Sequence, residues 1–282
     1  MLVAAMTSFA HTVWAQVPTE KNLLWKISGG GLSRPSYLFG TFHLLCADNV
    51  ESSEVLRAKL ADTERLVLEL DFSDPSLVGQ MMQLSAMRGD TSLADLFSEE
   101  AYESLTRDFQ AVTGMPLQPM ARMKPYLLVS MVMMPLLQCE VKGWEQVLME
   151  QATEYGLAVG GLETVGEQMA IFDAIPYGLQ AEQLQHSLQH TDSLMRAMDG
   201  MVALYKTEDI VKLHEQVRDE PTLLDYTALL LDNRNENWIP AIGEQARQEP
   251  TFFAVGAGHL GGEKGVIHLL RQAGYTLTPV EQ

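Results

Sequence analysis

Two histidines stand in the same local pattern near opposite ends of this 282-residue chain. His43 ends the stretch YLFGTFH and His259 ends FFAVGAGH, so each follows an apolar run and a Gly-x-x spacing, and each precedes a leucine. Imidazole is the commonest metal ligand and a proton carrier near neutral pH. The repeated pattern predicts that both imidazoles share one site. The competing interpretation is that each is an ordinary hydrogen-bonded loop histidine.

Two glutamates are candidates for the same site. Glu69 lies in the run VLELD, where a carboxylate is costly to bury unless it is paired or bound to a metal. Two histidines and a carboxylate form a reasonable ligand set for Zn²⁺, Mn²⁺ or Fe²⁺, with open positions for water. Alternation along an edge strand would instead expose Glu69 to solvent. Glu163 is a candidate further ligand or general base, or else a carboxylate favoured by the dipole of the helix that follows it.

Other side chains support more than one interpretation. Arg234 is a candidate to orient a substrate carboxylate or to stabilise an oxyanion, although a salt bridge to a neighbouring acid is the simpler role. His186 and His190 have the i, i+4 spacing of a zinc pair but lack the glutamate of a His-Glu-x-x-His motif, which favours a solvated helix face. The chain has no Gly-x-Ser-x-Gly elbow and no complete phosphate or dinucleotide fingerprint. Methionines concentrated in residues 115–134 predict core filling, or alternatively a flexible apolar groove.

Strands and turns at the start of the chain predict how the first histidine is positioned. Residues 23–27 and 37–42 read as strands around a glycine turn, and Ser52 is expected to cap a helix that leads to a strand at 65–71. Strand, helix and strand at this spacing predict a βαβ unit with neighbouring parallel strands. Ligands bind beyond the carboxyl ends of such strands. Gly40 and Gly256 are expected to adopt backbone angles that other residues avoid.

The rest of the chain predicts a mixed central sheet with N- and C-terminal βαβ-type elements and a large, mainly helical insertion. The fold class is therefore α/β, or α+β, in a single domain over residues 16–282. The expected helices are 98–114, 125–137, 144–155, one starting after the capping box at Thr164, several between 180 and 237, and 264–273. The further expected strands are 158–163, 251–255 and 275–279.

Composition and charge narrow the functional class. The formal net charge of -18 should repel phosphate backbones and anionic lipid, so we expect no nucleic-acid partner. Residues 1–15 are apolar and end in a small-residue pattern, which predicts a signal peptide and a periplasmic or secreted protein, although the positive n-region is missing. A frayed apolar terminus is the alternative. We expect no other membrane span, because the best candidate at 125–138 is too short and contains proline.

The two cysteines, Cys46 and Cys139, have two interpretations. In an oxidising compartment they could form a disulfide, although the sequence cannot show that they approach each other. Cys46 lies three residues after His43, so it could also be a metal ligand. The absence of any Cys-x-x-Cys spacing makes the metal role the less favoured one.

Several motifs together resemble the TraB/GumN family, which is related to the Tiki metalloproteases and more remotely to the erythromycin-esterase-like fold. The motifs are YLFGTFHLL (37–45), LVLEL (66–70), GLETVGEQ (161–168) and FFAVGAGHL (252–260), with KPY (124–126), GWE (143–145) and RN (234–235).

The resemblance implies a Tiki-like fold and a divalent-metal hydrolase site, in which His43, His259 and Glu69 hold Mn, Co or Zn. A peptide or protein would be the substrate. Apart from the resemblance, the residues themselves suggest Glu163 as the general base and Arg234 as a group that orients a substrate carboxylate or stabilises an oxyanion. Haem-binding relatives with a similar fold keep a second interpretation open, a ligand-binding protein that sequesters peptide or haem without turnover. The resemblance leaves homo-oligomerisation open.

Overall fold

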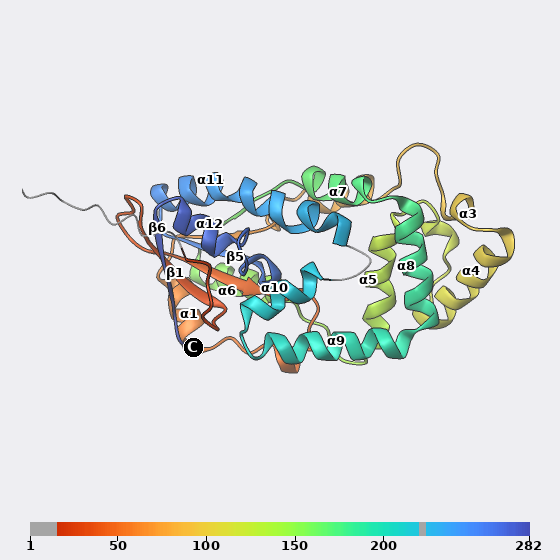
Figure 1. Cartoon of the computed structure of the whole chain (residues 1–282), viewed down its shortest axis with the longest axis horizontal. Coiled ribbons are helices and arrows are strands. Elements are labelled where there is room, and N and C mark those ends of the chain that lie inside the picture. The colour runs from red at the N-terminus through yellow and green to blue at the C-terminus, as the bar shows by residue number, and fades with distance from the viewer. Residues whose placement is uncertain (1–15, 220–223) are drawn as a thin grey trace, which may run out of the picture.

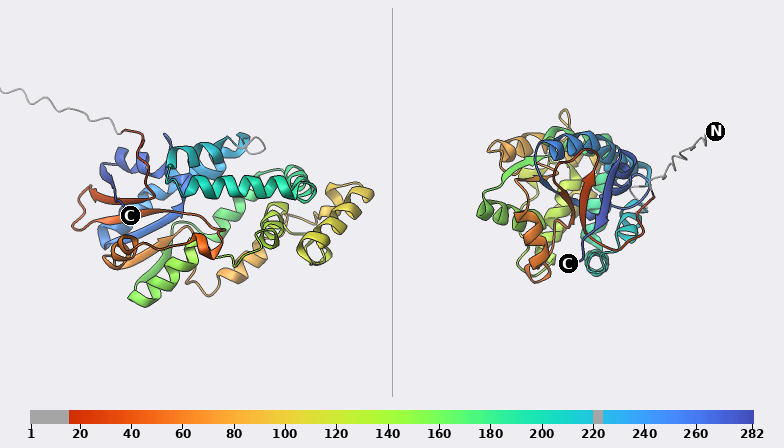
Figure 2. Two further views of the ribbon diagram at one scale, coloured as in Figure 1. Left: turned by 90° about the horizontal axis from the view of Figure 1, so that it is seen from below. Right: turned by 90° about the vertical axis from the view of Figure 1, so that its left-hand side faces the viewer.

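The computed structural model describes residues 16–219 and 224–282. A β-sheet occupies one end of the elongated molecule and a group of helices the other, with α7 and α9 running between them (Figures 1 and 2). The predicted signal peptide lies outside the described residues. Within the described ranges, no helix combines the length and the apolar character needed to cross a membrane.

The sheet confirms the predicted α/β class with mixed strand directions. Its order in the described residues is β4-β3-β5-β2-β1-β6. The pairs β4–β3, β3–β5 and β5–β2 are parallel, whereas β1 is antiparallel to both β2 and β6. The bounds are β1 Leu24–Gly29, β2 Ser36–Thr41, β3 Arg65–Leu68, β4 Ala158–Gly161, β5 Thr251–Gly256 and β6 Tyr275–Pro279.

One topological expectation is wrong. The strands β2 and β3 of the N-terminal βαβ unit are not neighbours, because β5 from the far end of the chain lies between them. The apolar run of β5 pairs on both sides and is buried, which explains why it lacks polar alternation. The two ends of the chain therefore close one sheet.

Helices cover both faces of the sheet and form the rest of the molecule. Helices α1 and α6 lie on one side and α11 and α12 on the other (Figure 1). The bounds are α1 Glu54–Ala61, α2 Leu77–Leu84, α3 Leu93–Leu96, α4 Glu99–Thr113, α5 Pro125–Leu136, α6 Trp144–Tyr155, α7 Val165–Ala174, α8 Tyr177–Gln189, α9 Thr191–Tyr205, α10 Ile210–Arg218, α11 Asn233–Gln248 and α12 Val266–Gln272.

Local capping signals predict most helix ends correctly. Gly114 takes the left-handed conformation that ends α4, and Thr164 with Glu167 forms the predicted capping box of α7. The start of α1 is one residue later than expected, since the Ser53 hydroxyl, not that of Ser52, accepts the hydrogen bond of Leu56 N–H. Both serines precede the helix, but only the second has its oxygen at capping distance.

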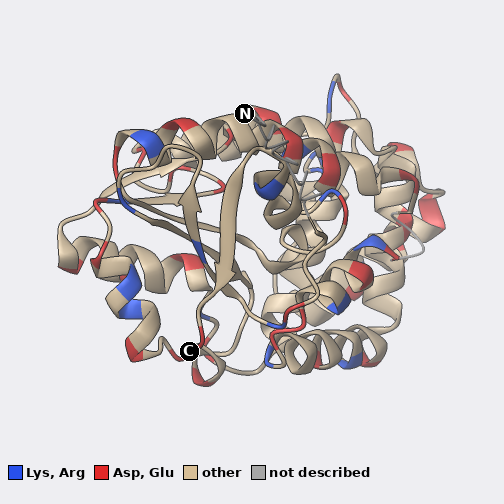
Figure 3. Cartoon of the chain, turned by 60° about the vertical axis from the view of Figure 1, so that its left-hand side comes forward, with Lys and Arg blue, Asp and Glu red and all other residues tan. Residues whose placement is uncertain are grey.

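Each end of the molecule has a hydrophobic core. The larger one fills the sheet and its covering helices, while a second one joins α3, α4, α5 and α8 through Leu93, Leu105, Phe109, Leu128 and Leu184. The helical insertion therefore has packing of its own and forms a firm wall opposite the strand ends. Acidic side chains are spread over many helices and loops, whereas the strands carry few charges (Figure 3).

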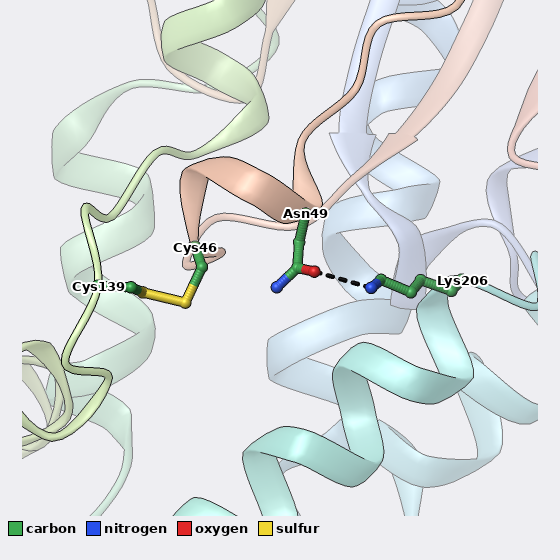
Figure 4. Close-up of a disulfide and its surroundings, with 4 residues drawn as sticks. All are labelled: Cys46, Asn49, Cys139 and Lys206. Atoms are coloured by element: carbon green, nitrogen blue, oxygen red, sulfur yellow. Dashed lines mark hydrogen bonds between the residues drawn. A yellow bond between two sulfur atoms is a disulfide. The ribbon is translucent and has the colours of Figure 1, made fainter.

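A disulfide joins Cys46 to Cys139, with 5.6 Å between their Cα atoms (Figure 4). It fastens the loop after β2 to the segment between α5 and α6. Backbone hydrogen bonds from Ala47 to Glu140 and from Lys142 to Leu45 extend the same junction. Cys46 is thus a structural crosslink, and the alternative metal-ligand role is wrong for this arrangement. The loop that carries His43 is tied to the helical part of the molecule.

Replacing both cysteines by serine should lower the free energy of unfolding by about 4 kcal/mol, because the crosslink closes a loop of nearly a hundred residues in the unfolded chain. Urea unfolding of the oxidised wild type and the double variant measures the difference. Lys206→Met is the matched local control, since it removes only the neighbouring hydrogen bond to Asn49 and should cost about 0.5 kcal/mol (Figure 4). Equal effects of both changes would contradict the crosslink.

Candidate functional site

The central position of β5 brings the predicted residues together. Strands β2 and β5 run parallel with Thr41 opposite Gly256, and β3 lies on the other side of β5, so all three strands end at one edge of the sheet. A Cβ atom placed on Gly256 would lie 3.3 Å from Glu69 Oε1, 3.5 Å from His259 Cδ2 and 3.6 Å from His43 Nε2. Both histidines and Glu69 therefore surround the same glycine.

The expectation that Gly40 and Gly256 adopt unusual backbone angles is wrong. The two glycines instead leave room for neighbouring side chains. Neither has a positive φ, and Gly256 has φ -52°. A Cβ on Gly40 would instead lie 2.7 Å from Leu260 Cδ1. The leucine that follows the second motif thus packs on the glycine of the first. This contact gives a physical reason for the glycine and the leucine in the repeated pattern.

His259 is buried and held in one tautomer. Its Nδ1–H donates to Asn235 Oδ1 at 2.6 Å, which leaves Nε2 with a lone pair, and Arg234 Nη1 donates to that atom at 3.1 Å. Burial disfavours the imidazolium and, with the nearby Arg234 charge, lowers the pKa of His259 to about 3 despite the opposing charge of Glu69. His259 is therefore neutral at pH 7, and its Nε2 has an unprotonated lone pair.

His43 stands on the open side of the site, with 60% of its side chain exposed. Its Nδ1 is 2.8 Å from Glu145 Oε1, which also accepts a hydrogen bond from the Thr41 hydroxyl at 2.7 Å. Desolvation in the cleft opposes protonation, but the hydrogen bond and charge of Glu145 outweigh it and raise the pKa of His43 to about 9. Nε2 is the nitrogen of His43 that faces Gly256.

Glu69 lies just beyond the end of β3 and is buried, so the solvated-face interpretation is wrong. Its Oε1 accepts the Gly256 N–H at 2.7 Å, and its Oε2 accepts from Arg234 Nη2 at 2.5 Å. Burial opposes its charge, but the Arg234 cation and the other neighbours outweigh this and lower the pKa of Glu69 to about 2. Glu69 is ionised at pH 7 and fixed at both oxygens.

Arg234 forms the salt bridge that the sequence offered as its simpler role. Besides Glu69, it donates to both oxygens of Glu163, at 2.6 and 3.0 Å. Glu163 also accepts from Gln168 at 3.0 Å and from Trp238 Nε1 at 3.3 Å. In this geometry Glu163 anchors the guanidinium. Its role as general base stays a prediction, and it would require Arg234 to move.

Four residues that the sequence indicated only as marks of the resemblance support the two histidines in the structure. Gly143 approaches the carbonyl oxygen of His43 so closely that a Cβ would lie 2.5 Å from it. Trp144 packs edge-on against Phe39, with ring centroids 5.0 Å apart, and Glu145 then reaches His43. Asn235 similarly orients His259 from the residue next to Arg234. Their proximity to the two histidines was not encoded in any local spacing.

The other predicted pair does not join the site. His186 and His190 lie at the end of α8 with ring centroids 4.4 Å apart, and both are exposed. Neither lines the cavities at the strand ends. Their position agrees with the solvated helix face that the sequence favoured.

Two cavities open at the strand ends. The larger has a volume of about 760 Å³ and reaches Glu69 and Glu145, and the smaller has about 420 Å³ and reaches Gly256 and His259. Both are lined by His43, Leu230 and Arg234. We call the two together the cleft. The candidate site lies where its two halves adjoin.

The predicted metal cluster is not preformed. In residues 16–219 and 224–282, no three His, Cys, Asp or Glu side chains are grouped closely enough to hold a metal ion. His259 Nε2 and Glu69 Oε1 are 3.9 Å apart, and Arg234 donates to both residues. The guanidinium thus takes up ligand atoms that a metal would need, and the ligand set stays a prediction.

The sheet and the cleft at its strand ends define a mixed α/β protein with histidines and a buried ion pair at the expected ligand position. The chain belongs to the TraB/PrgY/gumN family, whose model matches residues 23–279, and this confirms the resemblance read from the motifs. It is also 23% identical to Metalloprotease TIKI2 of Xenopus tropicalis over 88% of this chain and 58% of that protein.

A second relative is Metalloprotease TIKI2 of Danio rerio, 22% identical over 93% of this chain and 62% of that protein. The chain therefore spans less than two thirds of the length of these two relatives. Their names make a hydrolase the functional class to test.

The metal-free protein should be most stable near pH 6.5, the ordinary pKa of histidine. Between pH 6.5 and about 3, His259 is protonated in the unfolded chain but not in the folded one, so the free energy of unfolding falls by about 1.4 kcal/mol for each unit that the pH drops. Below pH 4.5, the ordinary pKa of glutamate, Glu69 lowers the free energy of unfolding further in the same way. Above pH 6.5, native His43 holds a proton that the unfolded chain loses, so its contribution disappears as the pH rises through about 9. Urea unfolding in EDTA across this range measures the profile.

Glu145→Gln tests the alkaline side of that profile. It should flatten the decline above pH 6.5, because it removes the carboxylate that raises the pKa of His43. Glu150→Gln, on the same helix and paired with Lys142, is the matched control and should leave the decline in place. An identical alkaline decline in both variants would show that His43 is not its source.

Proposed function

We propose that the protein is an exported, divalent-metal-dependent hydrolase that cleaves peptide bonds, with His43, His259 and Glu69 as the metal ligands. The observation that carries the proposal is the convergence of the two imidazoles and the buried carboxylate around Gly256, at the carboxyl ends of three parallel strands. The metalloprotease names of the two relatives support the reaction class. Export rests on the sequence of residues 1–15.

The donor atoms suit a divalent ion in type and orientation. Each histidine is hydrogen-bonded through Nδ1 to an oxygen, of Glu145 or Asn235, which is the usual arrangement of metal-binding histidines and leaves Nε2 as the ligand. The 3.9 Å between His259 Nε2 and Glu69 Oε1 is less than two metal–ligand bonds of about 2.1 Å laid end to end. Two changes are required: Arg234 must release His259 Nε2, and His43, whose pKa is raised to about 9, must lose a proton from Nε2.

In the proposed reaction, the ion and four residues of the site would have different roles. An ion held there supplies activation of water and polarisation of the scissile carbonyl. Glu145 and Asn235 hold the two imidazoles in orientation. Arg234, once free of His259, is placed to donate to the carbonyl oxygen as negative charge develops on it. Glu163, released from Arg234, would accept a proton as the general base.

The same contacts favour one alternative function. Arg234 pairs with Glu69 and Glu163 and hydrogen-bonds to His259, so these three residues need no metal ion to be stabilised in the cleft. A protein of this kind could bind a peptide or haem in the cleft and release it unchanged. Metal content separates the two functions, since only the hydrolase needs stoichiometric metal.

Elemental analysis of the untagged protein should find one divalent ion per chain, and a peptide library should be cleaved. His43→Ala, His259→Ala and Glu69→Gln should each abolish both metal retention and cleavage. Glu145→Gln should lower activity about 10–100-fold, because the His43 ring loses its orienting partner. His186→Ala is the control, since this exposed histidine lies outside the cleft. Protein that lacks metal, with metal uptake unchanged in the His43 and His259 variants, would exclude the hydrolase.

Arg234→Met should destabilise the EDTA-treated protein by about 3–5 kcal/mol, because it leaves two buried carboxylates without a cation. Added Mn²⁺ or Zn²⁺ should restore much of the loss, since an ion can then replace the guanidinium at Glu69 and His259. Thermal unfolding with and without the ion provides the measurement. Arg271→Met removes a cation that pairs with Glu20 and stacks over Trp25, so metal should not rescue it. Rescue of both variants, or of neither, would count against the exchange.

A further inference from the structure

The cleft extends to both sides of the candidate site. Its larger half of about 760 Å³ and its smaller half of about 420 Å³ adjoin at His43, Leu230 and Arg234. Each half alone has the size of a pocket for a drug-sized ligand, roughly 300–1,000 Å³. A ligand presented to His43 and Arg234 can therefore continue in two directions.

Apolar side chains line both halves of the cleft. The larger half includes Phe72, Met81, Met149, Ile171 and Phe172, and the smaller half includes Phe42, Met133, Met198, Met201 and Leu213. Methionine is unbranched and flexible, so such walls adapt to apolar side chains of different shapes. Of the methionines in residues 115–134, only Met133 lines the cleft, whereas Met120, Met123 and Met131 pack against the helical core, as the core-filling expectation predicts.

An apolar strip leads from the larger half to the surface. Phe72 and Met81 line the cavity. Met81 lies on α2, where Val78 and Met82 are 67% and 73% exposed. Isolated apolar residues on a surface are ordinary, but a group that continues a cavity wall marks a binding surface. A ligand that follows this strip would emerge over α2.

Polar groups along the cleft favour a peptide over an acyl chain. Ser130, Gln146 and Gln168 lie among the apolar residues of the larger half, and the backbone of residues 256–258 lines the smaller half. A peptide carries a hydrogen-bonding group at every residue, which such sites can satisfy, whereas an acyl chain has none to offer them. The net charge of -18 opposes an acidic peptide.

We propose that the cleft binds an extended, apolar, non-acidic peptide segment that crosses the site, with apolar side chains held on both sides of the bond at His43 and Arg234. Met149 of α6 selects on one side and Met201 of α9 on the other. The position of the scissile bond rests on the proposed function, but the binding does not. Hydrolysis of that bond adds the hydroxyl of water to the carbonyl carbon and a proton to the departing amine.

Binding is tested with fluorescently labelled eight-residue peptides and the EDTA-treated protein, so that no turnover is needed. The peptides are an apolar Leu/Phe/Met sequence, a Ser/Gln counterpart and an Asp-substituted counterpart, and an N-acylated dipeptide serves as the acyl probe. The apolar peptide should bind at least tenfold more tightly than the other three. Equal affinities, or preferential binding of the acyl probe, would overturn the proposal.

Charged variants locate the two selective walls. Met149→Glu and Met201→Glu should each weaken binding of the apolar peptide at least tenfold, and in the active protein each should remove the apolar preference on a different side of the cleaved bond. Met134→Glu is the matched control, because this methionine is exposed and lines neither half of the cleft. Met149→Gln and Met201→Gln replace any glutamate variant that fails to fold. Variants that bind as well as Met134→Glu would overturn the assignment.

The outcomes separate this inference from the proposed function. Tight binding of the apolar peptide without cleavage at any metal concentration would exclude the hydrolase and keep the binding mode. Cleavage of peptides with no apolar preference on either side would keep the hydrolase and exclude the binding mode.

Discussion

A single buried guanidinium connects the elements of the site. Arg234, at the start of α11, bonds to Glu69 after β3, to Glu163 after β4 and to His259 after β5, and it lies 4.7 Å from the Trp238 ring one turn further along the helix. Burying a charge is costly unless it is paired and hydrogen-bonded, so each of these partners must be in place for the others to be tolerated. The network therefore requires three strands to end together, and this requirement is met only when β5 lies next to β3.

The same requirement explains the form of the two histidine motifs. At the strand ends the chains approach closely: a Cβ at Gly40 would lie 2.7 Å from Leu260 Cδ1, and a Cβ at Gly256 would lie 3.3 Å from Glu69 Oε1, which accepts the Gly256 N–H. Asn235 of α11 and Glu145 of α6 hold the two rings from opposite sides of the sheet. Backbone packing, more than loop flexibility, sets the direction of each imidazole. The disulfide then holds the His43 loop against the helical wall of the cleft.

The sequence predicted which histidines lie in the site, but it did not predict the strand order or the hydrogen-bond partners that hold them there. The repeated Gly-x-x-His pattern correctly indicated that distant histidines meet, because an apolar run ending in the same motif twice implies two strands of one sheet. It could not show that β5 separates β2 from β3, since strand order depends on contacts between residues about two hundred positions apart. For the same reason, the sequence marked Glu145 only as part of the Gly-Trp-Glu tripeptide and did not show that it pairs with His43. Its partner His43 is 102 residues away, and no periodicity relates them. Helix ends were predictable because their capping signals are local.

The stability of the metal-free protein requires Arg234 to stay paired with Glu69 and His259, whereas metal binding requires it to leave them. Its guanidinium keeps its proton at all ordinary pH values, so a change of pH cannot remove the positive charge from between Glu69 and His259. A divalent ion can take the same lone pairs only if the side chain itself moves, and the ion must then supply the charge that Glu69 loses. Arg234 lies two residues after a π-helical turn, Ala228–Asp232, and one of its nitrogens also donates to Leu230 O within that turn. Such turns are rare and often mark functional sites. The irregular backbone is thus next to Arg234, the side chain that would have to move before His259 and Glu69 could bind a metal ion.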